Sequence, residues 1–130
     1  MKVVLLDLLG KTLIDIRENS DVNGDEMVLY LSNGDVYTMS HSQDCCEYVR
    51  IEDIEGDLKD LIGSPLTQAE ESTNREDKIG KEIHESFTWT FYKFATVKGY
   101  VTIRWLGESN GYYSEDVGLE MVIYSPEEDV

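Results

Sequence analysis

Positive charge is scarce in this sequence: 11 Lys and Arg stand against 27 Asp and Glu, a formal net charge of −16 at pH 7. Duplex DNA and anionic lipid attract proteins through clustered positive charge, which this chain lacks. We therefore expect no direct binding to nucleic acid or to a membrane. Apolar runs are also short, well below the roughly 20 residues that span a bilayer, and residues 1–9 lack the features of a signal peptide. The sequence predicts a protein of the cytoplasm.

Cysteine and proline are equally rare, with two of each. The two cysteines, Cys45 and Cys46, are adjacent, which argues against a disulfide framework and fits a reducing compartment. The length of 130 residues suits one domain, and the 41% of hydrophobic residues exceeds what a disordered acidic tail would carry. We expect a single folded domain over residues 1–130, with its acidic residues at the surface.

Alternating apolar residues predict antiparallel strands over most of the chain. The clearest short hairpin joins 27–31 to 36–39 through Asn33-Gly34, because both of these residues tolerate the positive φ of a tight turn. A second hairpin joins 86–96 to 100–106 through Lys98-Gly99. The other expected elements are a short helix at 5–9 closed by Gly10, strands at 12–17, 48–51, 66–70 and 119–124, a loop at 41–47, and helical turns at 57–62 capped by Asp57.

Together these elements predict an α+β fold, built mainly on an antiparallel β-sheet or a partly open barrel with one or two short helices. Residues 72–82 are almost entirely polar, which predicts an exposed, mobile loop. Residues 125–130 are predicted to form a frayed acidic tail.

The second hairpin is free of acidic residues. None lies in 86–107, which instead holds three basic and seven aromatic residues. With Lys98-Gly99 as a two-residue loop, Lys93 lies opposite Arg104. Period-2 alternation then separates two faces of the hairpin. The predicted core face carries Tyr92, Phe94, Thr96, Val101, Ile103 and Trp105, and the other face carries Trp89, Phe91, Lys93, Ala95, Thr102 and Arg104.

Two cations on facing strands repel each other, so this hairpin needs an acidic neighbour. One interpretation is an anionic ligand with a flat ring, such as a nucleotide: Lys93 and Arg104 would hold phosphate, and Trp89 or Phe91 would stack on the base. The other is that Asp or Glu from a neighbouring strand, or from another subunit, neutralises the pair. Asn110 either contacts a base edge or sugar, or adopts the positive φ that its Asn-Gly context favours.

A smaller cluster, formed by His41, Asp44, Cys45 and Cys46, lies within six residues. Its spacing fits no zinc site, because no second Cys or His pair follows. A nucleophilic Cys45 with His41 as its base is one alternative, and two small, partly buried thiols are the interpretation we adopt. We expect no catalytic residue, no metal and no cofactor.

Several segments resemble a small phage and prophage protein family of unassigned function. They are 41–47 (HSQDCCE), 51–54 with 60–65, and 87–93 through 99–105 to 109–114. The resemblance covers most of the chain. It implies a bacteriophage setting, and hence the cytoplasm of the host cell, without implying an activity.

A further similarity is to the phage Thoeris anti-defence sponge proteins, which are small oligomers that sequester cyclic ADP-ribose-type signals without cleaving them. It rests on the Asp44-Cys45-Cys46 segment after an N-terminal hairpin, and on an aromatic strand followed by Ile103-Arg104. The similarity implies a homo-oligomer. It also implies that Phe87 or Phe91 stacks on the base, while Arg104 and Asn110 hold phosphate and sugar.

Two functional hypotheses follow. The first is capture, without cleavage, of a nucleotide-derived signal at a site that comprises Phe87, Trp89, Phe91, Lys93, Arg104 and Asn110. The second is an acidic inhibitor whose carboxylates mimic DNA phosphates and occupy the basic cleft of a host nucleic-acid-processing or defence enzyme, because 27 acidic residues create a field toward any basic partner.

Overall fold

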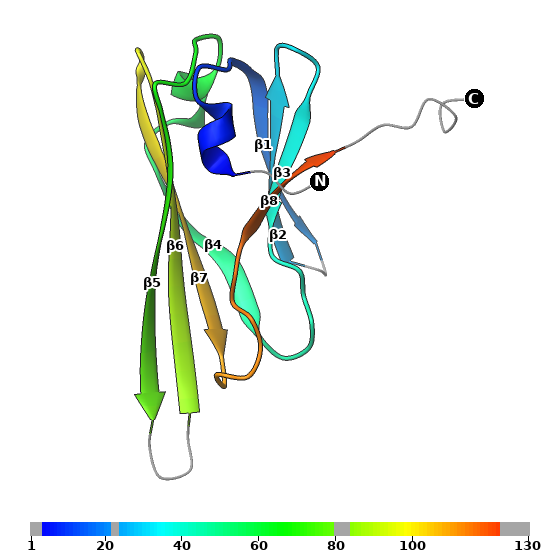
Figure 1. The fold of residues 1–130 in the computed structure, drawn as a ribbon, viewed down its shortest axis with the longest axis vertical. Helices are drawn as coiled ribbons and strands as arrows, with labels where there is room; N and C mark the ends of the chain where they lie inside the picture. Colours follow the sequence, from blue (N-terminus) through cyan, green and yellow to red (C-terminus); the bar gives the residue numbers. More distant parts are fainter. Residues whose placement is uncertain (1–3, 22–23, 80–83, 123–130) are drawn as a thin grey trace, which may run out of the picture.

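Residues 4–21, 24–79 and 84–122 are described by a computed structural model in which two four-stranded sheets pack face to face (Figure 1). The first sheet has the order β1-β2-β3-β8, the second has the order β4-β7-β6-β5, and every pairing between these strands is antiparallel. The elements are η1 (Leu5–Leu8), β1 (Leu13–Asp21), β2 (Gly24–Leu31), β3 (Val36–Ser40), β4 (Tyr48–Glu55), η2 (Leu58–Leu61), β5 (Gln68–Ile79), β6 (His84–Thr96), β7 (Gly99–Ser109) and β8 (Gly118–Val122).

The predicted fold class is therefore confirmed: the described chain is mainly antiparallel β-structure with two short 3-10 helices. The sheets do not close into a barrel. No helix in these residues is long and apolar enough to cross a membrane.

The hairpin of β2 and β3 forms where its sequence predicts it. Gly34 adopts a φ of +94°, and the Asn33 side chain accepts a 2.9 Å hydrogen bond from the backbone N–H of Asp35. The strands then pair Met27 with Met39 and Leu29 with Tyr37. This register places all four of these apolar side chains in the core.

The core lies between the two sheets. All six residues of the predicted core face of the β6–β7 hairpin are buried, none more than 7% exposed. The Trp105 ring crosses to the other sheet, where its Nε1 lies 3.3 Å from the sulfur of Met39. Period-2 alternation therefore identifies the inner face of this hairpin correctly.

The predicted turn and register of that hairpin are wrong. The loop is Val97-Lys98, Thr96 pairs with Gly99, and Lys93 faces Thr102 instead of Arg104. The turn is held by the distant η2 segment: the Thr96 hydroxyl donates to the Asp60 carbonyl, and the Lys98 ammonium donates to the Ile62 carbonyl at 2.6 Å. The observed register differs from the predicted one by two residues, an even number. Each side chain therefore stays on its predicted face of the hairpin, but Lys93 and Arg104 are not paired.

The predicted mobile loop at 72–82 is also wrong for its first eight residues. Residues 72–79 belong to β5, which pairs with β6 along its whole length. Figure 1 shows β5 and β6 extending past the first sheet, where neither face needs apolar side chains. The expected strand at 66–70 is thus the start of a longer one, and residues 80–82 lie outside the described part of the chain.

The predictions of the short helical segments and of the strand at 48–51 are confirmed. The helix at 5–9 and the turns at 57–62 appear as η1 and η2, and the Asp57 side chain caps η2 by accepting from the Lys59 N–H at 2.9 Å. The strand at 48–51 continues to Glu55 through an irregularity between Ile51 and Asp53. The predicted tail at 125–130 lies outside the described residues.

Candidate functional site

The aromatic residues of the predicted site share the outer face of the second sheet. The Trp89 and Phe91 rings on β6 stack with centroids 6.2 Å apart and planes 18° apart. The guanidinium of Arg104 on β7 lies 5.1 Å from the Trp89 ring centroid, a cation–π distance. Phe87 continues this row and has the Lys78 ammonium 5.5 Å from its ring centroid.

The basic residues of that face already have acidic neighbours within the chain. Arg104 Nη1 donates to Asp53 at 3.0 Å and to Glu55 at 3.4 Å, both on β4. Lys93 lies opposite Glu70 on β5. Neutralisation by a neighbouring strand, one of the two sequence interpretations, therefore accounts for Arg104, while for Lys93 the facing residue on the neighbouring strand is acidic. Only the Nε of Arg104 is buried without a hydrogen-bond partner among the described residues.

Asn110 is not brought to the same place. β7 ends at Ser109, which lies about 17 Å along the strand from Arg104, since each residue of a strand adds about 3.4 Å. Asn110 is the next residue, beyond the end of the strand. Its side chain accepts a 3.0 Å bond from the Tyr112 N–H, and the positive φ of this turn, +89°, belongs to Gly111 instead. Asn110 therefore stabilises the turn, and the prediction that it adopts a positive φ is wrong.

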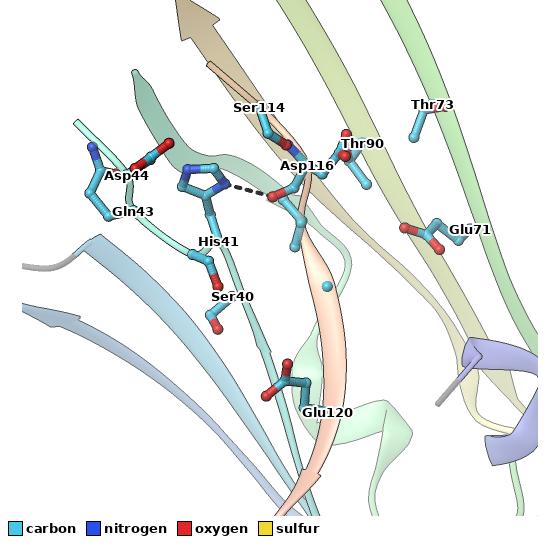
Figure 2. A pocket seen from close by; sticks show the side chains of 13 residues that line it. Ser40, His41, Gln43, Asp44, Glu71, Thr73, Thr90, Ser114, Asp116 and Glu120 are labelled. Carbon is cyan, nitrogen blue, oxygen red and sulfur yellow. Dashed lines mark hydrogen bonds between the residues drawn. The ribbon is translucent and has the colours of Figure 1, made fainter. Parts of the chain in front are cut away.

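A groove that the sequence does not reveal opens between the two sheets (Figure 2). It has a volume of 610 Å³ and is lined by four exposed carboxylates, from Asp44, Glu71, Asp116 and Glu120. In the part of the chain that the structure describes, no Lys or Arg lines it. The remaining polar groups of its wall are His41, Gln43, Ser40, Ser42, Thr73, Thr90 and Ser114.

The chain is similar to a known protein family over most of its length. Residues 6–119 match the family described as Domain of unknown function (DUF7448). The chain belongs to this family. No curated protein and no solved structure matches it. Membership agrees with the predicted resemblance to a family of unassigned function.

His41 in the groove wall contacts both the β7–β8 connection and the buried Glu47 carboxylate. Its Nδ1 lies 2.6 Å from the Asp116 carbonyl oxygen and its Nε2 lies 2.8 Å from the Glu47 carboxylate. Both partners are hydrogen-bond acceptors, and together they fix the orientation of the ring. Each ring nitrogen is thus directed at an acceptor other than Cys45.

Glu47 is a buried carboxylate that stays ionised. Burial alone raises its pKa, but hydrogen bonds from the Cys45 N–H, from His41 and from the Asp44 N–H outweigh that effect and lower the pKa to about 2. Both backbone bonds measure 2.8 Å. The carboxylate thus fixes the 41–47 loop at the mouth of the groove.

The cysteines of this loop differ from the prediction of two partly buried thiols. Both Cys45 and Cys46 are exposed, and a disulfide joins them. The prediction is wrong because the loop folds around Glu47 and turns the neighbouring cysteine side chains outward. With His41 fully bonded and Cys45 in a disulfide, the structure brings together no thiol and base.

A second buried carboxylate belongs to Glu115 in the β7–β8 connection, and it contacts the second sheet. It accepts from the hydroxyls of Ser86 at 3.2 Å and Thr88 at 2.6 Å, and from that of Ser109. Gly107 leaves room for it, since a Cβ there would lie 2.7 Å from the Cβ of Glu115. The sequence signal for this site is the alternation of hydroxyl residues at 86, 88 and 90 in an otherwise aromatic strand.

Tyr92 is a buried residue close to Glu71, Asp116 and Val117 of the groove wall. Burial raises its pKa well above the usual range, and the negative charges of Glu71 and Asp116 add to that effect. Its hydroxyl donates to the Val117 carbonyl at 3.1 Å. Tyr92 therefore remains a neutral hydroxyl that anchors the connection to β8.

Proposed function

We propose that this DUF7448 protein is a non-catalytic binding protein that takes a basic segment of another protein into the groove between its two sheets. The observation that carries the proposal is the set of four carboxylates around one open space, none of which pairs with a Lys or Arg among the described residues. Unpaired surface carboxylates in a concave site focus a negative field outward. A guanidinium or ammonium entering the groove would therefore meet several acceptors at once.

The charge of the whole chain supports the same partner. A net charge of −16 accelerates the encounter with a basic surface and repels polyanions. A protein surface that normally binds nucleic acid carries clustered Lys and Arg. Such a surface is complementary in charge to this protein. Inhibition of a nucleic-acid-processing or defence enzyme by phosphate mimicry, the second of the two hypotheses drawn from the sequence, is one form of this function.

Neutralising the groove tests the proposal. The double variant Glu71→Gln/Glu120→Gln should bind a Lys-rich decapeptide about 5- to 30-fold more weakly than the unmodified protein, because two ion pairs of about 0.5–1 kcal/mol each are lost. Calorimetry at 50 and 200 mM NaCl measures this, and we expect the affinity to fall steeply with salt. The control Glu18→Gln/Glu26→Gln removes the same charge from the first sheet. Equal losses in both variants would show that net charge alone binds the peptide.

A second candidate function, sequestration of a nucleotide-derived signal on the outer face, is favoured by one observation. The buried Nε of Arg104, beside the stacked Trp89 and Phe91, has a proton to donate to an acceptor such as phosphate. If this function is correct, a nucleotide, cyclic nucleotide or ADP-ribose derivative will raise the unfolding free energy by about 2.7 kcal/mol at a hundredfold excess over Kd. Arg104→Ala should abolish that shift while Arg17→Ala keeps it. A panel without any shift in the unmodified protein would contradict this function.

A further inference from the structure

The free edge of the second sheet is formed by β5, which pairs with β6 and with no other strand in the described chain. All residues from Glu70 to Lys78 are exposed. Alternate residues of an edge strand direct their N–H and C=O groups away from the sheet, where another strand can bind them. The chain just before β5 is covered, because Leu66 exchanges backbone bonds with Gly10 and Lys11 at 2.8 Å. The open part of the edge thus begins beside the groove.

The charges of β5 disfavour a second copy of the same strand as the occupant, because residues 70–78 hold four carboxylates against two cations. An antiparallel pair centred on Thr73 places Glu70 opposite Glu76, and one centred on Asn74 places Glu71 opposite Asp77. A pair centred between them places Glu70 opposite Asp77 and Glu71 opposite Glu76. Like charges directly across a ladder are destabilising. The first two registers also contain the opposite-charge pairs Glu71–Arg75 and Glu70–Lys78, so the net charge of −2 on residues 70–78 of each copy (two basic against four acidic residues) is what disfavours self-pairing.

We infer that the β5 edge is a docking site for an extended basic segment of a partner protein, which adds to the second sheet as a fifth strand. Its backbone would bind N–H and C=O groups that β5 directs away from β6, while its side chains alternate between the two faces. Glu71 and Thr73 face inward on β5 and line the groove. Lys or Arg at alternate positions of the added strand therefore enter the groove toward Asp116 and Glu120.

The outer face accepts the other half of the side chains. There β5 presents Glu70 and Glu76 with the small residues Ser72 and Asn74 between them, which pair with Phe91 and Trp89 of β6. A long side chain of the added strand can cross these small residues and reach the aromatic rings. The edge therefore selects for positive charge on the inner side and tolerates apolar side chains on the outer side.

This inference rests on the proposed groove function and adds the backbone pairing, so the test varies only the peptide. The probes are two decapeptides of equal charge, one that alternates Lys and Thr and one that alternates Lys and Pro. Proline removes every second N–H and does not sit in a paired strand, while the lysines remain. We expect the Lys-Thr peptide to bind at least tenfold more tightly and to slow amide hydrogen exchange at alternate residues of 70–78.

The outcomes separate the two proposals. Equal affinity of both peptides, with losses in the Glu71→Gln/Glu120→Gln variant and no protection of β5, would overturn strand addition and leave the groove function standing. Protection of β5 by the Lys-Thr peptide in that variant, without loss of affinity, would support the edge and overturn the groove. Absence of binding by either peptide at 50 mM NaCl would overturn both.

Discussion

Replacing Glu47 by alanine is expected to lower the free energy of unfolding by about 3–5 kcal/mol, because three groups lose a common buried hydrogen-bond acceptor at about 1–3 kcal/mol each. The variant leaves Nε2 of His41 without its carboxylate partner, and the N–H groups of Asp44 and Cys45 without their acceptor. Urea denaturation at pH 7 measures the loss. A variant within about 0.5 kcal/mol of the unmodified protein would show that the 41–47 loop holds its shape without Glu47.

The same carboxylate predicts a specific response to acid. Its pKa is about 2 in the folded protein, against a usual 4.5. Because the folded pKa is the lower one, the stabilisation is complete above pH 4.5 and is lost as the pH falls from about 4.5 toward 2. Glu47→Gln cannot titrate, so its stability should fall less over this range than that of the unmodified protein. Parallel stability curves for the two proteins would contradict the assignment.

Replacing Glu115 by alanine is expected to lower the free energy of unfolding by about 2–4 kcal/mol. The hydroxyls of Ser86, Thr88 and Ser109 would lose their common acceptor, and each unsatisfied buried polar group costs about 1–3 kcal/mol before local relaxation. The measurement is again urea denaturation. The neighbouring Asp116→Ala is the matched control, because that side chain is exposed. Equal stability of the two variants would mean that Glu115 contributes no more than a surface acid.

The inner face of the second hairpin was predictable because it depends on a local property. Strand alternation places Tyr92, Ile103 and Trp105 on one side whichever residues form the turn, provided that the register shifts by an even number. The turn itself was not predictable from Lys98-Gly99, because contacts with Asp60 and Ile62 hold it. Those contacts join segments more than 30 residues apart in the chain.

The strand at 72–79 was missed for a different physical reason. Strands are recognised in sequences by one apolar face, and β5 has none where it extends beyond the first sheet. Its stability comes from pairing with β6 and from that neighbour's buried face. The polar pattern that suggested a loop is the pattern of an exposed edge strand that carries charge against self-association.

The candidate site was predictable only in part. Trp89, Phe91 and Arg104 were correctly placed on one face, and the acidic neighbours of Arg104 were one of the stated alternatives. The groove was invisible because its carboxylates come from the 41–44 loop, β5, the β7–β8 connection and β8. Only the packing of two sheets brings such distant segments around one space.

The central claim, that the groove beside β5 receives a basic segment, is tested most directly by mapping where such a segment binds. Backbone amide chemical shifts recorded during titration with the Lys-Thr decapeptide would locate it residue by residue. Binding in the groove and along β5 predicts shifts concentrated at 40–44, 70–78 and 114–120, with β1 unchanged. Shifts spread evenly over the acidic residues of both sheets, or centred on Trp89 and Arg104, would contradict it.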